Sequence, residues 1–151
     1  MTLPPLKLPD VNVLLHAVDT THPHHGVARN WLQNALKEGG GVGFAWVVLV
    51  GFVRVSTRAG ILTAPLSVAD SLGIMDDWLR HGAARVVHPG ERHAGVMGAL
   101  LLAAGAAGNL TNDAHLGALA IEHDAIVGTF DKDFKRFPGV RLDLLKSKPV
   151  H

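Results

Sequence analysis

Along this chain the apolar positions recur either at helical spacing or in short uninterrupted runs. From Val27 to Leu36 they repeat every three to four residues, and the pattern stops at glycines 39–41, which predicts a helix that ends there. Ser67 is in position to cap a second helix. The apolar side of that helix is formed by Val68, Leu72, Met75 and Leu79. The same spacing predicts further helices over residues 91–104 and 113–123.

Short apolar runs between these helices predict β-strands. The runs cover residues 41–45, 84–89, 125–129 and a last one near 140–142. Strands that alternate with helices in this way are typical of an α/β fold around a mostly parallel sheet. Residues 46–57, WVVLVGFVRVST, are ambiguous, because their valines favour a strand whereas their length suits a helix.

Length and composition predict one globular domain that spans residues 1–151. Hydrophobic residues make up 48% of the chain and the mean hydropathy is +0.23, which is enough for a substantial core. The net charge of +1 gives no overall attraction to anionic partners, so a nucleic acid would have to be bound by a local patch. The chain has no cysteine, which excludes disulfides and thiolate metal sites, while its ten histidines leave imidazole ligands possible.

Targeting and membrane signals are weak in this sequence. The first ten residues, MTLPPLKLPD, lack the apolar core that a signal peptide needs, and their prolines would interrupt one. The longest uncharged run, residues 94–108, is shorter than the ~20 apolar residues that a membrane-spanning helix requires. We therefore expect a soluble, cytoplasmic protein without a membrane role.

One predicted helix is unusually apolar. In its second half, GALLLAAG, every side is apolar, so this part of the helix is either internal or covered by another chain. Together with Trp46 and Phe52 it indicates more apolar surface than a monomer of this size covers. We therefore expect a homodimer or an assembly with another protein.

Carboxylates occur where the predicted elements end or begin. Asp10 follows the first apolar segment, and Asp131 and Asp133 follow the strand 125–129. In parallel sheets, ligands bind at the carboxyl ends of the strands, so these side chains are expected at one edge. Asp113 shares a helix face with the apolar residues that follow it at spacings of three and four, which directs it toward the core.

Each aspartate also has a simpler interpretation. Asp10 and Asp113 can cap the helices that begin beside them, and the segment Asp131-Lys132-Asp133 can form an ordinary turn. Taken together, however, three or four carboxylates at one edge would repel one another and raise their pKa values unless a cation were present. Mg²⁺ and Mn²⁺ prefer such oxygen ligands, and they can activate water for attack on a phosphate.

Three segments resemble a known family in order and spacing. LPDVNVLLHAV, LVGFVRVST and NDAHLGALAIEHDAIVGTFDKDFKRFPGVRL are similar to the PIN-domain toxins of VapBC toxin-antitoxin modules. The resemblance implies a Mg²⁺- or Mn²⁺-dependent endoribonuclease with a three-layer α/β/α sandwich. It also implies a dimer and inhibition by a cognate VapB-type antitoxin. The valine-rich segment 46–57 would then be a helix.

The resemblance assigns roles to individual residues. Asp10, Asp113 and Asp131 would bind the metal, and Asp133 would be an accessory member of the catalytic group. Asn12 and Thr129 match polar positions beside that pocket. Apart from the resemblance, if the acidic pocket binds RNA, Arg54 and Lys132 are candidate phosphate contacts around it. For the two cations, a place on a solvated face is the usual alternative. The RNA target, the antitoxin and the number of metal ions are not determined by the sequence.

One departure from the family concerns activity. Its members usually carry a glutamate in the helix after the second strand, and the matching position here is Gly51. The alternative is therefore a weakened PIN domain that binds RNA or its antitoxin without efficient cleavage. A phosphate-transfer receiver or phosphatase with Asp10 as nucleophile is disfavoured, because no lysine stands in the expected late position beside a strand. The histidines of HPHH, residues 22–25, are interpreted as the polar start of a helix.

Overall fold

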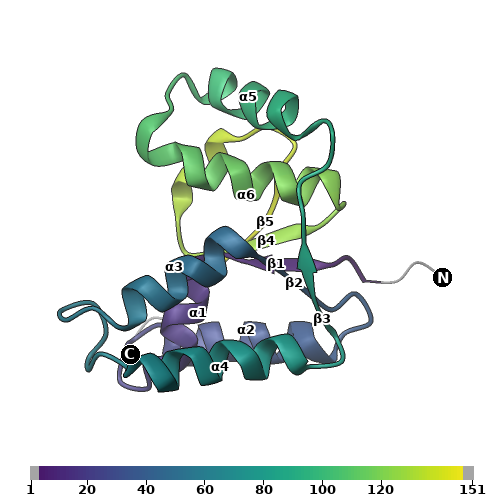
Figure 1. Ribbon diagram of the computed structural model, residues 1–151. Coiled ribbons are helices and arrows are strands. Elements are labelled where there is room, and N and C mark those ends of the chain that lie inside the picture. Colours follow the sequence, from purple (N-terminus) through teal and green to yellow (C-terminus); the bar gives the residue numbers. More distant parts are fainter. Residues whose placement is uncertain (1–3, 148–151) are drawn as a thin grey trace.

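Five parallel strands form the central sheet of the computed structural model, which describes residues 4–147 (Figure 1). The two ends of the predicted domain 1–151 lie outside the described residues. Along the sheet the strands follow the order β3-β2-β1-β4-β5. Their bounds are Lys7–Pro9 for β1, Val42–Ala45 for β2, Ala84–Val87 for β3, Ile126–Thr129 for β4 and Arg141–Leu144 for β5.

Helices cover both faces of this sheet. Helices α5 and α6 lie together on one side, and α1, α2 and α4 lie on the other, while α3 packs against α1 and α4 (Figure 1). The sequence prediction of a three-layer α/β/α sandwich is confirmed. The helix bounds are Val11–Val18 for α1, His25–Lys37 for α2, Trp46–Ser56 for α3, Val68–Arg80 for α4, His93–Ala104 for α5 and Thr111–Glu122 for α6. Two 3₁₀ turns, η1 at Gly108–Leu110 and η2 at Lys132–Arg136, complete the elements.

The ambiguous valine-rich segment is helix α3. Its buried side chains, Val48, Leu49, Phe52 and Ser56, recur at helical spacing and face the core. Burial of this stripe against α1 and α4 outweighs the preference of valine for strands. Ser67 caps α4 by accepting a hydrogen bond from the Asp70 backbone N–H, as the sequence predicts.

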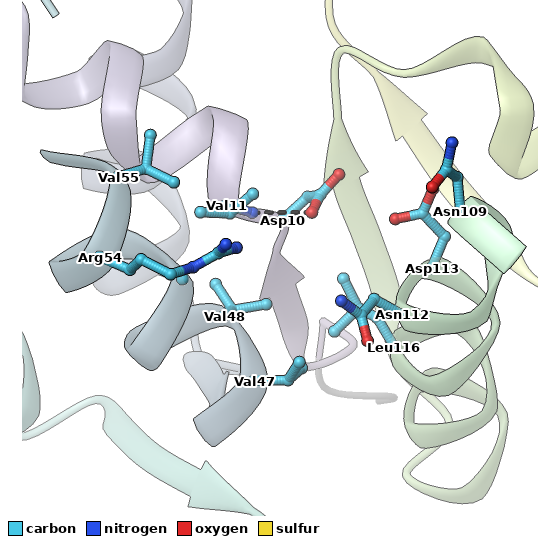
Figure 2. A pocket seen from close by; sticks show the side chains of 11 residues that line it. Asp10, Val11, Val47, Val48, Arg54, Val55, Asn109, Asn112, Asp113 and Leu116 are labelled. Atoms are coloured by element: carbon cyan, nitrogen blue, oxygen red, sulfur yellow. Dashed lines mark hydrogen bonds between the residues drawn. The ribbon is translucent and has the colours of Figure 1, made fainter. Parts of the chain in front are cut away.

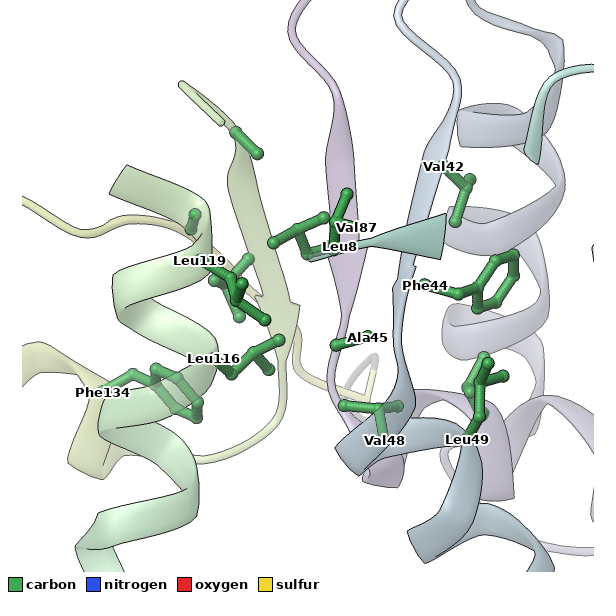
Figure 3. Packing of buried hydrophobic residues seen from close by; sticks show 14 of the residues in the cluster. Leu8, Val42, Phe44, Ala45, Val48, Leu49, Val87, Leu116, Leu119 and Phe134 are labelled. Carbon is green, nitrogen blue, oxygen red and sulfur yellow. The ribbon is translucent and has the colours of Figure 1, made fainter. Parts of the chain in front are cut away.

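The core fills the space between the sheet and its helices. Leu8 and Phe44 project from the central strands, and Leu116 and Leu119 of α6 pack over the sheet (Figure 3). Phe134 follows β4 and closes the core beside α6 (Figure 3). This packing fixes α6, and with it Asp113, relative to the ends of the strands.

The strand order changes direction between β1 and β4. From β1 the chain adds β2 and then β3 on one side, and it returns to place β4 on the other side of β1. Pro9 of β1 pairs with Gly128 of β4, so the residues that follow this pair, Asp10 after β1 and Thr129 at the end of β4, stand side by side. Such a switch point forms a crevice at the carboxyl ends of the strands, where α/β proteins bind ligands.

The boundaries of several elements differ from the sequence prediction. Helix α6 begins at Thr111, two residues before the predicted start, and α5 begins at His93, two residues after it. The last strand covers Arg141–Leu144 because it pairs along the whole of β4, whose register the local sequence does not encode. The strand predicted over residues 84–89 ends at Val87, where its pairing with β2 ends.

Helix α5 lies on the outside of the molecule. Only Leu100 of this helix is buried, and 84% of the Leu102 surface is exposed, so the helix is not internal. Phe52, expected to add to the exposed apolar surface, is instead fully buried in the core, because it lies on the inner face of α3. Trp46 is exposed. Within residues 4–147 no helix is both long and apolar enough to cross a membrane.

Candidate functional site

A cavity of about 200 Å³ opens at the switch point of the sheet, between α3 on one side and α6 on the other (Figure 2). Asp10 lies at its base, Asp113 points into it from α6, and Arg54 reaches into it from α3 (Figure 2). The lining residues are Asp10, Val11, Val47, Val48, Gly51, Arg54, Val55, Asn109, Asn112, Asp113 and Leu116. The fold thus brings together residues from three distant parts of the chain.

Asp10 is buried and held by hydrogen bonds. Its Oδ1 accepts a 2.7 Å bond from the Val11 backbone N–H, so it caps α1 as one sequence interpretation predicts. Its Oδ2 accepts a 2.7 Å bond from Thr129 Oγ1 and a 3.3 Å bond from Asn12 Nδ2. Burial raises the pKa of Asp10, the bonds from Thr129 and Val11 oppose this rise, and repulsion from Asp131 adds to it. Asp10 therefore has a structural role and also lines the cavity.

Thr129 and Asn12 connect the ends of β1 and β4. The Thr129 hydroxyl oxygen accepts a 3.0 Å bond from the Asp131 backbone N–H. Asn12 donates weakly to Thr129 Oγ1 at 3.4 Å, and its Oδ1 accepts from the Phe130 backbone N–H at 3.3 Å. Both side chains lie beside the carboxylates, as the sequence predicts, but they orient Asp10 and the Asp131 turn and are not part of the cavity wall.

Asp113 has no comparable support. It lies in the first turn of α6, and its carboxylate accepts no hydrogen bond from the part of the chain that the structure describes, so the capping interpretation is wrong. Burial, together with repulsion from Asp10, Asp131 and Asp133, raises its pKa to about 7. A half-buried carboxylate close to three others is an arrangement whose mutual repulsion a bound cation would relieve.

Asp131 and Asp133 belong to the turn after β4. Asp131 caps η2, because its Oδ1 accepts a 2.9 Å bond from the Asp133 backbone N–H, so the turn interpretation of this segment is correct. Asp133 is exposed, and neither residue lines the cavity. Both nevertheless lie close enough for their charges to act on Asp113.

The carboxylates of this site could supply two of the oxygen ligands that a hard cation such as Mg²⁺ needs. Between residues 4 and 147 no three His, Asp or Glu side chains are already grouped as ligands around one point. Asp10 and Asp113 do face the same cavity, and one or two carboxylates completed by water are a usual coordination for Mg²⁺. The residues present therefore fit one divalent ion between Asp10 and Asp113. Asp131 does not line this cavity, and its Oδ1 is engaged in capping η2.

Comparison with known proteins identifies the family. The family profile of the PIN domain matches residues 7–140. Ribonuclease VapC37 of Mycobacterium tuberculosis is 46% identical over 138 residues, which are 91% of this chain and 96% of that protein. Ribonuclease VapC33 of the same organism is 37% identical over 134 residues, 89% of this chain and 94% of its own. This chain is a VapC-type member of the PIN-domain family.

Solved structures share the fold of this PIN domain. A chain of VapBC2 from Rickettsia felis, crystallised with a DNA fragment from the promoter, has a TM-score of 0.69 at 20% identity and covers 93% of this chain and 99% of its own. A chain of DNA-bound VapBC from Salmonella typhimurium has a TM-score of 0.66 at 15% identity, covering 93% and 98%. The strand order of this PIN domain also differs from the order 2-1-3-4-5 of phosphate-transfer receivers, which contradicts the receiver interpretation.

Gly51 of this PIN domain lines the cavity from α3. A Cβ atom at this position would meet only the Val11 side chain, at 3.4 Å, which is an ordinary contact. Close packing therefore does not require a glycine here. The position where the family resemblance places a glutamate faces the carboxylates, and in this chain it contributes no charge.

The two basic residues predicted to contact RNA, Arg54 and Lys132, differ in position. Arg54 lies one turn after Gly51 on α3 and lines the same cavity. Its guanidinium makes no ion pair or hydrogen bond with any residue in the range 4–147. Lys132 is exposed on η2 and is not part of the cavity wall. Arg54 is thus part of the pocket, whereas Lys132 lies at its margin.

Two asparagines of the pocket were not predicted as site residues. Asn109 of η1 and Asn112 of α6 line the cavity, and Figure 2 shows Asn109 beside Asp113. Asn112 lies in the first turn of α6, whose cap position is Leu110. Their signal in the sequence is proximity to Asp113, since both precede it within four positions.

The histidines of HPHH do more than begin a helix. His22 stacks on His16 of α1 with ring centroids 4.0 Å apart, and His24 stacks on Phe130 at 4.4 Å. Burial and the positive charges of His22 and His24 together lower the pKa of His16 to about 4. His16 Nδ1 is buried without a hydrogen-bond partner among the described residues. This histidine cluster holds the start of α2 against the turn that carries Asp131.

Proposed function

We propose that this VapC-type PIN domain is a metal-dependent endoribonuclease and the toxin of a toxin-antitoxin pair. The observation that carries the proposal is the pair Asp10 and Asp113, which line one cavity, where burial and the neighbouring carboxylates raise the pKa of Asp113 to about 7. The similar proteins from Mycobacterium tuberculosis are named ribonucleases, which supports RNA as the substrate. The proposal covers the whole chain, residues 1–151, as one PIN-like domain.

In this proposal each residue has a defined task. Asp10 and Asp113 hold one Mg²⁺ or Mn²⁺ ion, and Asp131 and Asp133 supply further negative charge at its outer side. Bound there, the ion would lower the pKa of a water molecule and neutralise charge that develops on the phosphate. Asn12 and Thr129 keep Asp10 oriented toward the cavity. Arg54 binds the RNA backbone within the pocket, and Lys132 binds it at the margin.

Cleavage assays with and without metal test the proposal. Purified protein is incubated with structured RNA in Mn²⁺, in Mg²⁺ and in EDTA, after removal of any antitoxin. We expect cleavage in either metal and none in EDTA. Equal cleavage in EDTA would contradict the metal requirement.

A second function is favoured by Gly51, where a carboxylate is missing from the cavity wall. A weakened PIN domain would bind RNA or its antitoxin and cleave poorly. RNA retention on immobilised protein, without detectable products in either metal, would favour this alternative.

The partner we propose is a VapB-type antitoxin. The solved chains with the same fold come from VapBC complexes, and this chain offers an apolar groove beside Arg54. The groove is lined by Trp46, Leu49, Val50, Val53, Arg54, Leu72 and Met75. Since its RNA substrate would be cellular RNA, we further propose that the protein acts in the cytoplasm.

We also propose a homodimer through α5. Leu102 is 84% exposed on a helix without charged residues after His93, and such a surface is usually covered by another subunit. Light scattering of the wild type and of Leu102→Glu tests this. We expect a dimer for the wild type and a monomer for the variant, and a wild-type monomer at high concentration would contradict the proposal.

A further inference from the structure

Charges of opposite sign line opposite walls of the pocket. Arg54 enters from α3, and Asp113 enters from α6 on the other side, with Asp10 at the base between them (Figure 2). None of the ion pairs among residues 4–147 joins Arg54 to either carboxylate. The cavity of about 200 Å³ separates them. Arg54 is therefore available to a ligand rather than used to neutralise the acidic wall.

A ligand that satisfies both walls has to carry both charges. The carboxylate wall favours a cation, and the guanidinium favours an anion that can accept two parallel hydrogen bonds. A phosphate group in contact with a divalent cation has this combination. The order of charges from α6 to α3 would then alternate, with carboxylates, cation, phosphate and arginine in sequence.

Gly51 explains why Arg54 is free to take this role. The two residues are three positions apart on α3, and both line the cavity. Oppositely charged side chains at this spacing on a helix pair with each other. A glutamate at position 51 would therefore bind Arg54 or a second cation, whereas the glycine leaves the guanidinium unpaired.

We propose that Arg54 binds the scissile phosphate directly. Its guanidinium takes the place of the second cation that a glutamate at position 51 would help to bind, so that the site works with one divalent cation and one arginine. This inference rests on the proposed nuclease function. The guanidinium donates to the non-bridging phosphate oxygens, and its charge offsets the negative charge that grows there during attack by water.

The test separates metal binding from phosphate binding. Arg54→Gln and Arg54→Lys are compared with Arg29→Gln, which changes an exposed arginine of α2 that does not line the cavity. Calorimetry with Mn²⁺ alone gives the affinity and the number of ions per chain. A second titration with inorganic phosphate in saturating Mn²⁺ gives the phosphate affinity, and single-turnover RNA cleavage gives the rate.

We expect one Mn²⁺ ion per chain, with the same affinity in the wild type and in Arg54→Gln. The variant should bind phosphate at least ~10-fold more weakly and cleave RNA ~10²- to 10³-fold more slowly, the usual effect of removing one group that stabilises the transition state. Arg54→Lys should recover part of the phosphate affinity and part of the cleavage rate, because lysine keeps the charge but loses the paired donors. Arg29→Gln should behave as the wild type.

Two results would overturn the inference. One is an Arg54→Gln protein that binds phosphate as tightly as the wild type, and the other is a wild type that binds two Mn²⁺ ions per chain. Gly51→Glu, with Gly51→Ala as its control, adds an independent check: it should bind Mn²⁺ more tightly but phosphate more weakly. If the wild type lacks Mn²⁺-dependent cleavage, the nuclease function fails, and the phosphate titration still decides the role of Arg54.

Discussion

Thr129 Oγ1 donates a 2.7 Å hydrogen bond to Asp10 Oδ2, although 119 positions separate the two residues in the chain. The bond exists because β1 and β4 are parallel neighbours whose register sets Pro9 opposite Gly128. It fixes one carboxylate at the base of the pocket, whereas Asp113 on the facing helix has no such support. The two acids that face the cavity are therefore unequal, and variants at each should behave differently.

Replacing Thr129 with valine should destabilise the protein. Thr129 is fully buried, and its loss leaves the Asp131 backbone N–H without its hydrogen-bond partner and Asp10 Oδ2 with only the 3.3 Å bond from Asn12. We expect Thr129→Val to lower the free energy of unfolding by about 1–3 kcal/mol, measured in urea without metal. Thr129→Ser keeps the hydroxyl and should recover most of the loss. A Thr129→Val protein as stable as the wild type would mean that water replaces the hydroxyl.

Removing the charge at Asp113 should stabilise the metal-free protein at high pH. The folded-state pKa is about 7, above the ordinary value of 3.8, so stability falls as pH rises between these values and the full penalty is present above pH 7. Asp113→Asn should therefore raise the melting temperature at pH 8 by about 2–4 °C, less than full burial would give because the carboxylate is partly exposed. The difference should vanish near pH 4. A lower melting temperature at pH 8 would indicate a structural bond that we have missed.

The histidine cluster should make stability fall in mild acid. His16 has a folded-state pKa of about 4, below its ordinary 6.5, so the unfolded chain takes up a proton first and stability declines as pH falls from 6.5 toward 4. His16→Phe keeps an aromatic ring but does not titrate. The melting temperature of His16→Phe should change less between pH 7 and pH 5 than that of the wild type. The control is His88→Phe, at an exposed site. If the melting temperature of His88→Phe depended on pH as little as that of His16→Phe, the assignment to His16 would be contradicted.

Gly51→Ala should stabilise the protein slightly. The added Cβ meets only Val11 at 3.4 Å, and alanine favours a helix over glycine by about 0.5–1 kcal/mol. We expect a gain of this order in urea unfolding. A clear loss would show that the glycine serves close packing after all.

Local patterns predicted much of this molecule, because they report directly on burial. The spacing of apolar residues after Asp113 indicated that it faces inward, and short apolar runs marked β2, β3 and β4. The helical state of α3 followed only from the family resemblance, because the valines of this segment favour a strand when the local sequence is considered alone.

Long-range neighbours could not be predicted in the same way. His16 and His22 stack because the chain reverses between α1 and α2, and Phe130 joins them through the sheet register. Likewise, Arg54 and Asp113 share a cavity only because α3 and α6 meet at the same edge of the sheet. Neither arrangement has a periodic signal along the sequence.

The central claim is that the Asp10 and Asp113 pocket binds the cation that RNA cleavage requires. The most direct measurement is Mn²⁺ binding by calorimetry together with single-turnover RNA cleavage, in the wild type, in Asp113→Asn and in Asp77→Asn as an exposed control on α4. We predict that Asp113→Asn remains folded but loses Mn²⁺ binding and at least ~10²-fold of the cleavage rate, while Asp77→Asn matches the wild type. A folded Asp113→Asn protein that binds Mn²⁺ and cleaves RNA as the wild type does would contradict the claim.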